Sequence, residues 1–300
     1  MSAEHCVRAF KSLQDELCKG LETLDGSGAR FSEDVWSRPG GGGGRSRTFT
    51  GDLIEKGGVG FSEVFGTLSP AAAESLGTAP GEFVATGVSI VLHPHNPWMP
   101  IIHMNVRYFE LEQGQWWFGG GIDLTPHYII PALARQFHGR LKAVCDRHEA
   151  ADYESFKSAA DDYFYLPHRE ETRGVGGIFY DRVVPPTFEE GLALSLDVGR
   201  AFVPCYADQA EALRERSFGE SHQHWQHHRR GRYVEFNLVW DRGTKFGLQT
   251  NGRTESILMS MPPRADWTYD LQIEPNSLES ETQAWLRKGV DWLSDSLGGS

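Results

Sequence analysis

The hydrophobic pattern at the start of the chain predicts an amphipathic helix. Apolar residues recur at steps of three or four from Val7 to Leu24, and charged residues such as Asp15 and Glu16 occupy the other positions. This spacing places the apolar side chains on one helix face. Asp25–Gly28, a stretch that tolerates positive φ, is expected to end the helix.

Residues 83–109 alternate with a period of two, which predicts two β-strands joined by a turn at 95–100. In the second strand His103, Asn105 and Arg107 share one face. A core does not require such a polar row, so we take it as the centre of a candidate site.

The pairing of these strands is a separate prediction. A hairpin centred near Trp98 places His93 opposite His103 and Ser89 opposite Arg107. A shift of the register by two residues would keep the faces and change the partners.

The rest of the chain predicts an α+β fold. An aromatic strand at 116–118 runs into three glycines, and further strands are expected within 233–261. Helices are expected from about residue 131, and at 152–164, 187–214 and 279–295. Because regular βαβ alternation is lacking, we expect a mainly antiparallel sheet with helices packed on it, in one domain spanning 1–300.

Charge and composition reduce the number of functional classes to which the protein could belong. The 300 residues contain 29 Lys and Arg against 41 Asp and Glu, a net charge of −12 that disfavours a nucleic-acid binder. The four cysteines share no ligand spacing and are expected to be reduced. With no apolar run long enough to span a membrane and no signal-peptide pattern, we expect a cytoplasmic protein.

A glycine- and arginine-rich loop is expected at 33–50, where Gly40–Gly44 precedes Arg45 and Arg47. Glycines alone would favour a flexible linker. The adjacent arginines favour a lid over an anion instead, because exposed N–H groups and guanidinium groups both bind anions.

Ten residues form the candidate constellation. Arginine forks suit carboxylates or phosphates, histidine transfers protons near neutral pH, and an aspartate beside positive charge can act as a base. These residues are Arg45, Arg47, Arg107, Arg253, Ser89, His93, His103, Asn105, Asp123 and Asp241.

Structural roles stay open for several of these residues. Asp241 could cap a turn, and Asp123 could orient the glycine loop. His138 and His168 are as compatible with packing as with function. Metal-ligand spacings such as HExxH are missing, and the four histidines within 222–228 fit a solvated polar segment better than a metal tract.

Seven blocks resemble the oxygen-dependent coproporphyrinogen III oxidases, in matching order from about residue 7 to 295. They are Gly41–Arg47, Gly87–Pro100, His103–Arg107, Trp116–Pro126, Asp161–Arg169, Tyr233–Thr250 and Arg253–Pro263. The resemblance implies a homodimer whose broad antiparallel sheet is flanked by helices on both faces. It also implies oxidative decarboxylation of two propionates of coproporphyrinogen III to vinyl groups, giving protoporphyrinogen IX, CO₂ and H₂O₂ in haem biosynthesis.

The resemblance also implies residue roles. His103 matches the proton donor, and 233–267 matches the dimerisation segment. The positions matching substrate-binding residues are Ser89, Asn105, Val106, Arg107, Asn251, Gly252 and Arg253, with Asn251 replacing a glycine of many relatives. The positions matching a divalent metal site, Mn²⁺ in bacterial relatives, are His93, His103, His138 and His168. No organic cofactor is implied.

These roles lead to a mechanistic hypothesis. Asp123 or Asp241 would deprotonate a pyrrole N–H, and Arg107 would hold the reacting carboxylate. A closed four-histidine cage would leave His103 unable to donate a proton. Two other classes stay open: a non-catalytic tetrapyrrole-binding protein and a histidine-based metallohydrolase.

Overall fold

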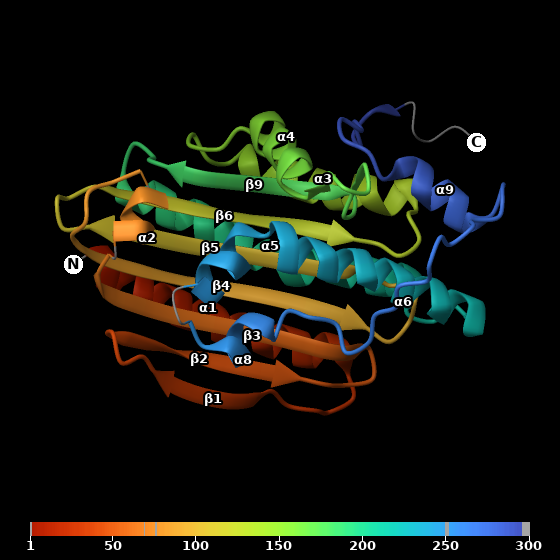
Figure 1. Ribbon diagram of the computed structural model, residues 1–300, viewed down its shortest axis with the longest axis horizontal. Coiled ribbons are helices and arrows are strands. Elements are labelled where there is room, and N and C mark those ends of the chain that lie inside the picture. Colours follow the sequence, from red (N-terminus) through yellow and green to blue (C-terminus); the bar gives the residue numbers. More distant parts are fainter. Residues whose placement is uncertain (1, 69, 76, 250–251, 296–300) are drawn as a thin grey trace.

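A seven-stranded antiparallel sheet dominates the computed structural model, which describes residues 2–68, 70–75, 77–249 and 252–295 (Figure 1). The strands lie in the order β1-β2-β3-β4-β5-β6-β9. Their bounds are Ser32–Ser37, Gly42–Phe49, Ile54–Thr67, Glu82–Pro94, Ile101–Leu111, Trp116–Thr125 and Gly176–Val183. The short strands β7 (Tyr165–Leu166) and β8 (Glu171–Thr172) form a separate pair. The predicted α+β class is confirmed.

One face of the sheet carries the main core. The helices α1 (Ser2–Asp25), α3 (Pro131–Cys145) and α5 (Phe188–Leu213) pack on this face. Alternation along β5 explains the arrangement, because Ile102, Met104 and Val106 are all fully buried in that core. We call this face the core face, and the face with His103 the site face.

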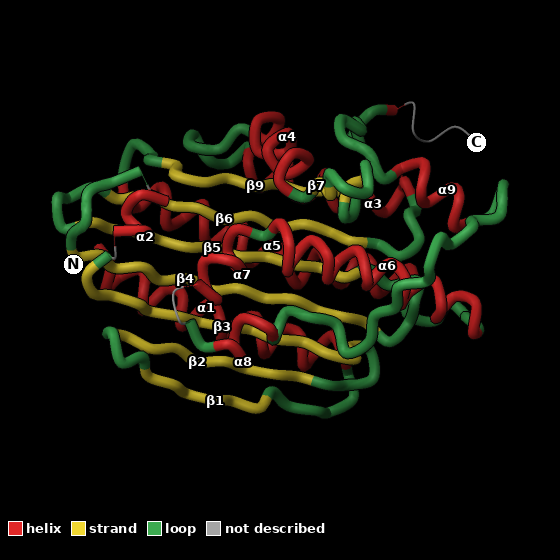
Figure 2. Tube along the Cα trace, in the orientation of Figure 1, coloured by secondary structure: helices red, strands yellow, loops and turns green. Residues whose placement is uncertain are grey.

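Helices also cover the site face, as the resemblance implies (Figure 2). This cover comprises α6 (Glu220–Glu235), the π-helical turn η1 (Phe236–Trp240), α7 (Arg242–Gln249) and α8 (Thr254–Leu258). After α8, Ser260 O contacts the His93 ring, and Met259 lies against Gly58 of β3. The remaining helices are α2 (Pro70–Ser75), α4 (Tyr153–Tyr163) and α9 (Leu278–Trp285). No helix within the described ranges is long and apolar enough to cross a membrane.

The predicted strands at 233–261 are wrong, because the described part of this segment contains the end of α6, then η1, α7 and α8, and no strand. The alternating apolar residues suggested a strand, but burial follows the helical spacing. Tyr233, Phe236 and Asn237 are buried, whereas Leu238 and Trp240 are exposed. Positions three and four apart share one helix face, so the polar Asn237 is inside and apolar neighbours face outward.

The β4–β5 register differs from the predicted one by two residues. Val91 pairs with His103, Ser89 with Asn105 and Gly87 with Arg107. The connecting loop fixes this register through Asn96, whose Nδ2 donates to carbonyls at the end of α5 and beyond it, at Leu213, Arg214 and Arg216. The faces stay as predicted.

The expected glycine- and arginine-rich loop at 33–50 is mostly the hairpin of β1 and β2. Arg45 and Arg47 lie on the core face, at the edge where α1 crosses the sheet. Arg45 Nε donates to Gln14 Oε1 at 2.6 Å, and Arg47 forms an ion pair with Asp15 at 2.7 Å. The structure therefore does not bring either arginine to the face that carries His103, and they form no lid there.

Candidate functional site

His103 and Asp123 form the centre of the site, on adjacent strands. His103 on β5 pairs with Asp123 on β6, and the two side chains meet with 2.7 Å between His103 Nδ1 and Asp123 Oδ1. The second carboxylate oxygen, Oδ2, accepts from Arg173 Nη2 at 2.6 Å. Asp123 and Arg173 are each only 2% exposed, whereas His103 is 18% exposed. Asp123 thus faces protein on both sides, and His103 faces the open side.

The charge of Asp123 sets the tautomer of His103. Burial acts to raise the pKa of Asp123, but the charge of Arg173 and the bond from His103 together bring it below its ordinary value. The carboxylate is therefore ionised and accepts the Nδ1–H of His103. The other nitrogen, Nε2, lies 3.4 Å from Asn105 Nδ2 and is the atom that can exchange a proton with a ligand.

Arg173 is a residue that sequence reasoning missed. Its guanidinium lies 4.4 Å from the ring centre of Phe164 and 4.6 Å from the rings of Tyr233 and Phe236. These three rings enclose the cation and fix its direction toward Asp123. The available signal was an arginine next to a glycine loop, which we interpreted only as a loop.

The predicted row on β5 is confirmed as a geometric unit. Arg107 Nη2 donates to Asn105 Oδ1 at 2.8 Å, so the amide lies between the guanidinium and His103. Arg107 and Ser89 are exposed, and Ser89 lies directly across from Asn105. Val106 points the other way into the core, so only its backbone could reach a ligand.

Glycines on the neighbouring strands leave the sheet surface beside Arg107 and Asn105 without side chains. Gly87 and Gly119 flank Arg107 on the neighbouring strands, and Gly121 flanks Asn105. Without side chains at these positions, a flat molecule can lie close to the backbone of the sheet.

Asp241 borders the site from the helical cover. Its carboxylate accepts from Tyr163 Oη at 2.7 Å and from the backbone N–H of Thr244 at 2.6 Å. Burial acts to raise its pKa, but these bonds and the nearby His103 bring the pKa below the ordinary value. Asp241 thus stabilises the first turn of α7, the capping role left open above, and its carboxylate remains ionised. Arg242 stacks over Tyr163 at 5.0 Å.

Arg253 lies farther along the same face. It forms an ion pair with Asp34 of β1, and Asp34 is in one transverse row with Ser46, Gly60 and Ser89. Three strand spacings, about 14 Å, separate Asp34 from Ser89. A cavity of about 310 Å³ opens beside Arg253. Gly252 directly precedes it, and Asn251 lies outside the described residues.

The four histidines predicted as metal ligands have separate partners. His93 Nε2 lies 2.8 Å from Ser260 O, and His138 in α3 contacts Tyr153 Oη at 2.9 Å and Val175 O at 3.0 Å. Burial lowers the pKa of His138 to about 4. Across the described part of the chain, no three His, Cys, Asp or Glu residues gather as a metal site. The four histidines therefore do not fit one metal ion.

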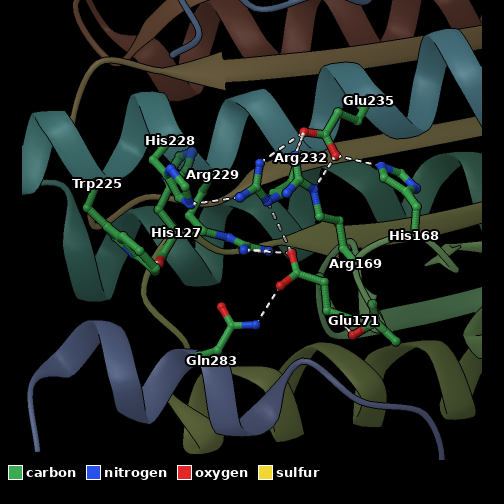
Figure 3. Close-up of polar contacts among 12 residues, drawn as sticks. His127, His168, Arg169, Glu171, Trp225, His228, Arg229, Arg232, Glu235 and Gln283 are labelled. Atoms are coloured by element: carbon green, nitrogen blue, oxygen red, sulfur yellow. Dashed lines mark hydrogen bonds and ion pairs between the residues drawn. The ribbon is translucent and has the colours of Figure 1, made fainter. Parts of the chain in front are cut away.

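His168 belongs to a network of charged residues on α6 and the β7–β8 hairpin (Figure 3). Its Nε2 lies 2.8 Å from Glu235 Oε2, and its Nδ1 accepts from Trp240 Nε1 at 3.0 Å. Glu235 also accepts from Arg169 and Arg232. Both nitrogens of His168 are thus engaged in holding the helical cover.

The His222–His228 tract lies in α6 and continues this network. His224 is exposed, as a polar helix predicts, but His228 is buried and stacks on Trp225 with ring centres 5.4 Å apart. His228 Nε2 accepts from Arg232.

A family model described as coproporphyrinogen III oxidase matches residues 5–292. The chain belongs to this family. The resemblance identified from the seven sequence blocks is confirmed.

Individual relatives of the coproporphyrinogen III oxidase family agree over most of the chain. The oxygen-dependent coproporphyrinogen-III oxidase of Parasynechococcus marenigrum (strain WH8102) is 48% identical, covering 94% of this chain and 85% of that protein. The protein of the same name from Prochlorococcus marinus (strain NATL1A) is 47% identical, covering 94% of this chain and 89% of its own length. The similarity thus extends over the sheet, the site face and its helical cover.

Proposed function

We propose that this chain is an oxygen-dependent coproporphyrinogen III oxidase of haem biosynthesis. For each of two propionates, –CH₂CH₂COOH and O₂ become –CH=CH₂, CO₂ and H₂O₂. The observation that carries the proposal is the His103–Asp123–Arg173 unit beside Arg107, on a glycine floor, in a chain of this family. A bulky substrate with four carboxylates explains why Arg107 and Arg253 lie over the same face of the sheet in an acidic protein.

Arg107, His103 and Asp123 have separate roles in the proposed reaction. Arg107 is exposed and offers its planar fork to the carboxylate of the reacting propionate. His103 Nε2 exchanges a proton at the open side of the site. Asp123 is a positioning residue, because its two oxygens are engaged by His103 and Arg173 and do not reach a ligand.

Asp241 is therefore the better candidate for the base that removes a pyrrole proton. Its carboxylate is ionised, lies at the edge of the helical cover and is only partly buried. Arg253 pairs with Asp34, whose place on β1 is about 14 Å from Ser89 by strand spacing, and this separation suits a second carboxylate on the far side of the macrocycle.

A homodimer is part of the proposal. In the segment 233–267, Leu238, Val239 and Trp267 are 46%, 49% and 52% exposed. Apolar side chains gathered in one exposed segment favour a protein contact. A cytoplasmic location stays a prediction. Because the four histidines have separate partners, we expect no requirement for a divalent metal such as Mn²⁺ bound by them.

Oxygen uptake tests the function. Purified protein is mixed with anaerobically prepared coproporphyrinogen III, with and without a strong chelator, and vinyl-containing product is measured. We expect uptake matched by product, and no loss with the chelator, because the four histidines do not share a site. Tight binding without uptake would instead favour the non-catalytic tetrapyrrole-binding protein.

A further inference from the structure

Three stacked aromatic rings lie on the site face next to Arg107. Phe109 on β5 pairs with Trp117 on β6, and their rings stack with centres 4.6 Å apart and planes 16° apart. Phe83 on β4 stacks on the other side of Phe109, at 5.5 Å and 9°. We call these three residues the aromatic ladder.

The aromatic ladder borders the same surface as the guanidinium. Phe109 follows Arg107 by two positions on β5, so both side chains point to the site face about 7 Å apart along the strand. On β6, Gly119 follows Trp117 by two positions and has no side chain of its own; Asp181 Oδ1 and Arg107 Cγ lie 3.3 and 3.4 Å from the position that a Cβ at Gly119 would take. The rings, the Arg107 cation and the Asp181 carboxylate therefore border one surface.

Packing alone does not account for the aromatic ladder. Its rings are only partly buried, and they contact a small cluster of Leu68, Ala73 and Leu111 that is separate from the main core. Parallel stacking turns the ring faces toward one another, so the three rings offer their edges as one row of apolar surface.

The substrate of the proposed function carries matching chemistry. Each pyrrole ring of coproporphyrinogen III has a methyl group beside its propionate. A propionate held by Arg107 leaves that methyl group and the ring edge within reach of Phe109 and Trp117. The guanidinium of Arg182, 5.7 Å from the Trp117 ring, adds positive charge at the far end of the aromatic ladder.

We propose that the aromatic ladder binds the methyl-bearing edge of the tetrapyrrole and determines specificity for methyl over acetate substituents. This inference rests on the proposed function. An acetate placed against the Phe109 ring would be a partly desolvated charge, which an apolar surface disfavours. The ladder therefore acts in recognition, beside the residues that handle protons.

Equilibrium binding tests the inference independently of turnover. The probes are coproporphyrin III and uroporphyrin III, whose methyl groups are replaced by acetates. We expect Phe109→Leu and Trp117→Leu to raise the Kd for coproporphyrin III about three- to tenfold and to lower the preference over uroporphyrin III. Trp117→Phe, which keeps a flat ring, should retain most of both.

Phe65→Leu is the matched control. Phe65 is 45% exposed on β3 but points to the core face, so its replacement should leave both Kd values unchanged. An unaltered preference in Phe109→Leu and Trp117→Leu would overturn the inference, as would an equal change in Phe65→Leu. Wild-type protein without oxygen uptake would refute the oxidase, whereas a lowered preference in Phe109→Leu and Trp117→Leu would still support the ladder.

Discussion

Asp123 lies directly opposite His103 in the β5–β6 pairing, and its carboxylate holds the imidazole from behind at 2.7 Å. The geometry makes Asp123 a partner of the histidine rather than of the substrate. A hydrogen bond of this kind fixes both the ring orientation and the nitrogen that carries the proton. In the proposed function, proton exchange at His103 therefore depends on a buried residue that does not face the open side of the site.

Replacing Asp123 by Asn should separate these effects. The amide can donate to Nδ1 and reverse the tautomer of His103, so we expect kcat to fall by at least about a hundredfold, with little change in the Kd for coproporphyrin III. Asp162→Asn, at an exposed carboxylate paired with Lys288, serves as the control. Equal losses of kcat and binding in Asp123→Asn would contradict the positioning role.

The Tyr163 hydroxyl should set the acid limit of activity. It donates to Asp241 and so helps to hold the pKa of that carboxyl below its usual range. In Tyr163→Phe the pKa of Asp241 should rise, and the acid limb of the kcat/KM profile should move to higher pH. A profile identical to that of wild type and of Tyr165→Phe, whose ring lies against Lys288, would argue against Asp241 as the base.

Glu235 should make stability depend on acid pH. Burial acts to raise its pKa, but Arg169, His168 and Arg232 lower it to about 2 in the folded state, from an ordinary value of 4.5. A depressed carboxyl pKa stabilises the fold above the unfolded pKa, and this contribution is lost as the pH falls from about 4.5 toward 2. The deficit of Glu235→Gln in unfolding free energy should therefore shrink below pH 4.5.

Urea unfolding of wild type and Glu235→Gln at several pH values between 6 and 3 measures this difference. The exposed Glu149→Gln should show little deficit at any pH. A deficit of Glu235→Gln that stays constant over this range would contradict the pKa assignment.

The exposed apolar segment should control assembly. A charge at Val239 would have to be buried in the proposed dimer, so Val239→Glu should shift the protein to a monomer in sedimentation velocity. Val35→Glu, at another exposed valine on β1, should sediment like wild type. If both variants remained dimeric, the interface would lie elsewhere.

The strand that carries the site could be predicted from the sequence because a period of two is a strong signal over ten residues. His103, Asn105 and Arg107 share a face on either register, so the two-residue error changed their neighbours and not the site. The prediction of strands at 233–261 failed because the signal in this segment is weak. Short apolar runs fit a strand or a helix equally well, and only packing decides between them.

Relations between distant residues were beyond sequence reasoning. Arg173 meets Asp123, Phe164 and Phe236 only because the sheet, α4 and η1 converge there. The faces of Arg45 and Arg47 likewise depend on how β2 is paired within the sheet. Their position beside glycines in the sequence does not indicate which face of β2 they occupy.

β5 is an inner strand, bonded to β4 on one side and β6 on the other. Moving His103 relative to Arg107 would require opening the sheet at its middle, which is among the last parts of a protein to exchange its amide hydrogens. The backbone spacing of the residues proposed for proton transfer and carboxylate binding is thus fixed. Under that proposal, adjustment to the substrate would fall to the exposed Arg107 side chain and to the helices above the sheet.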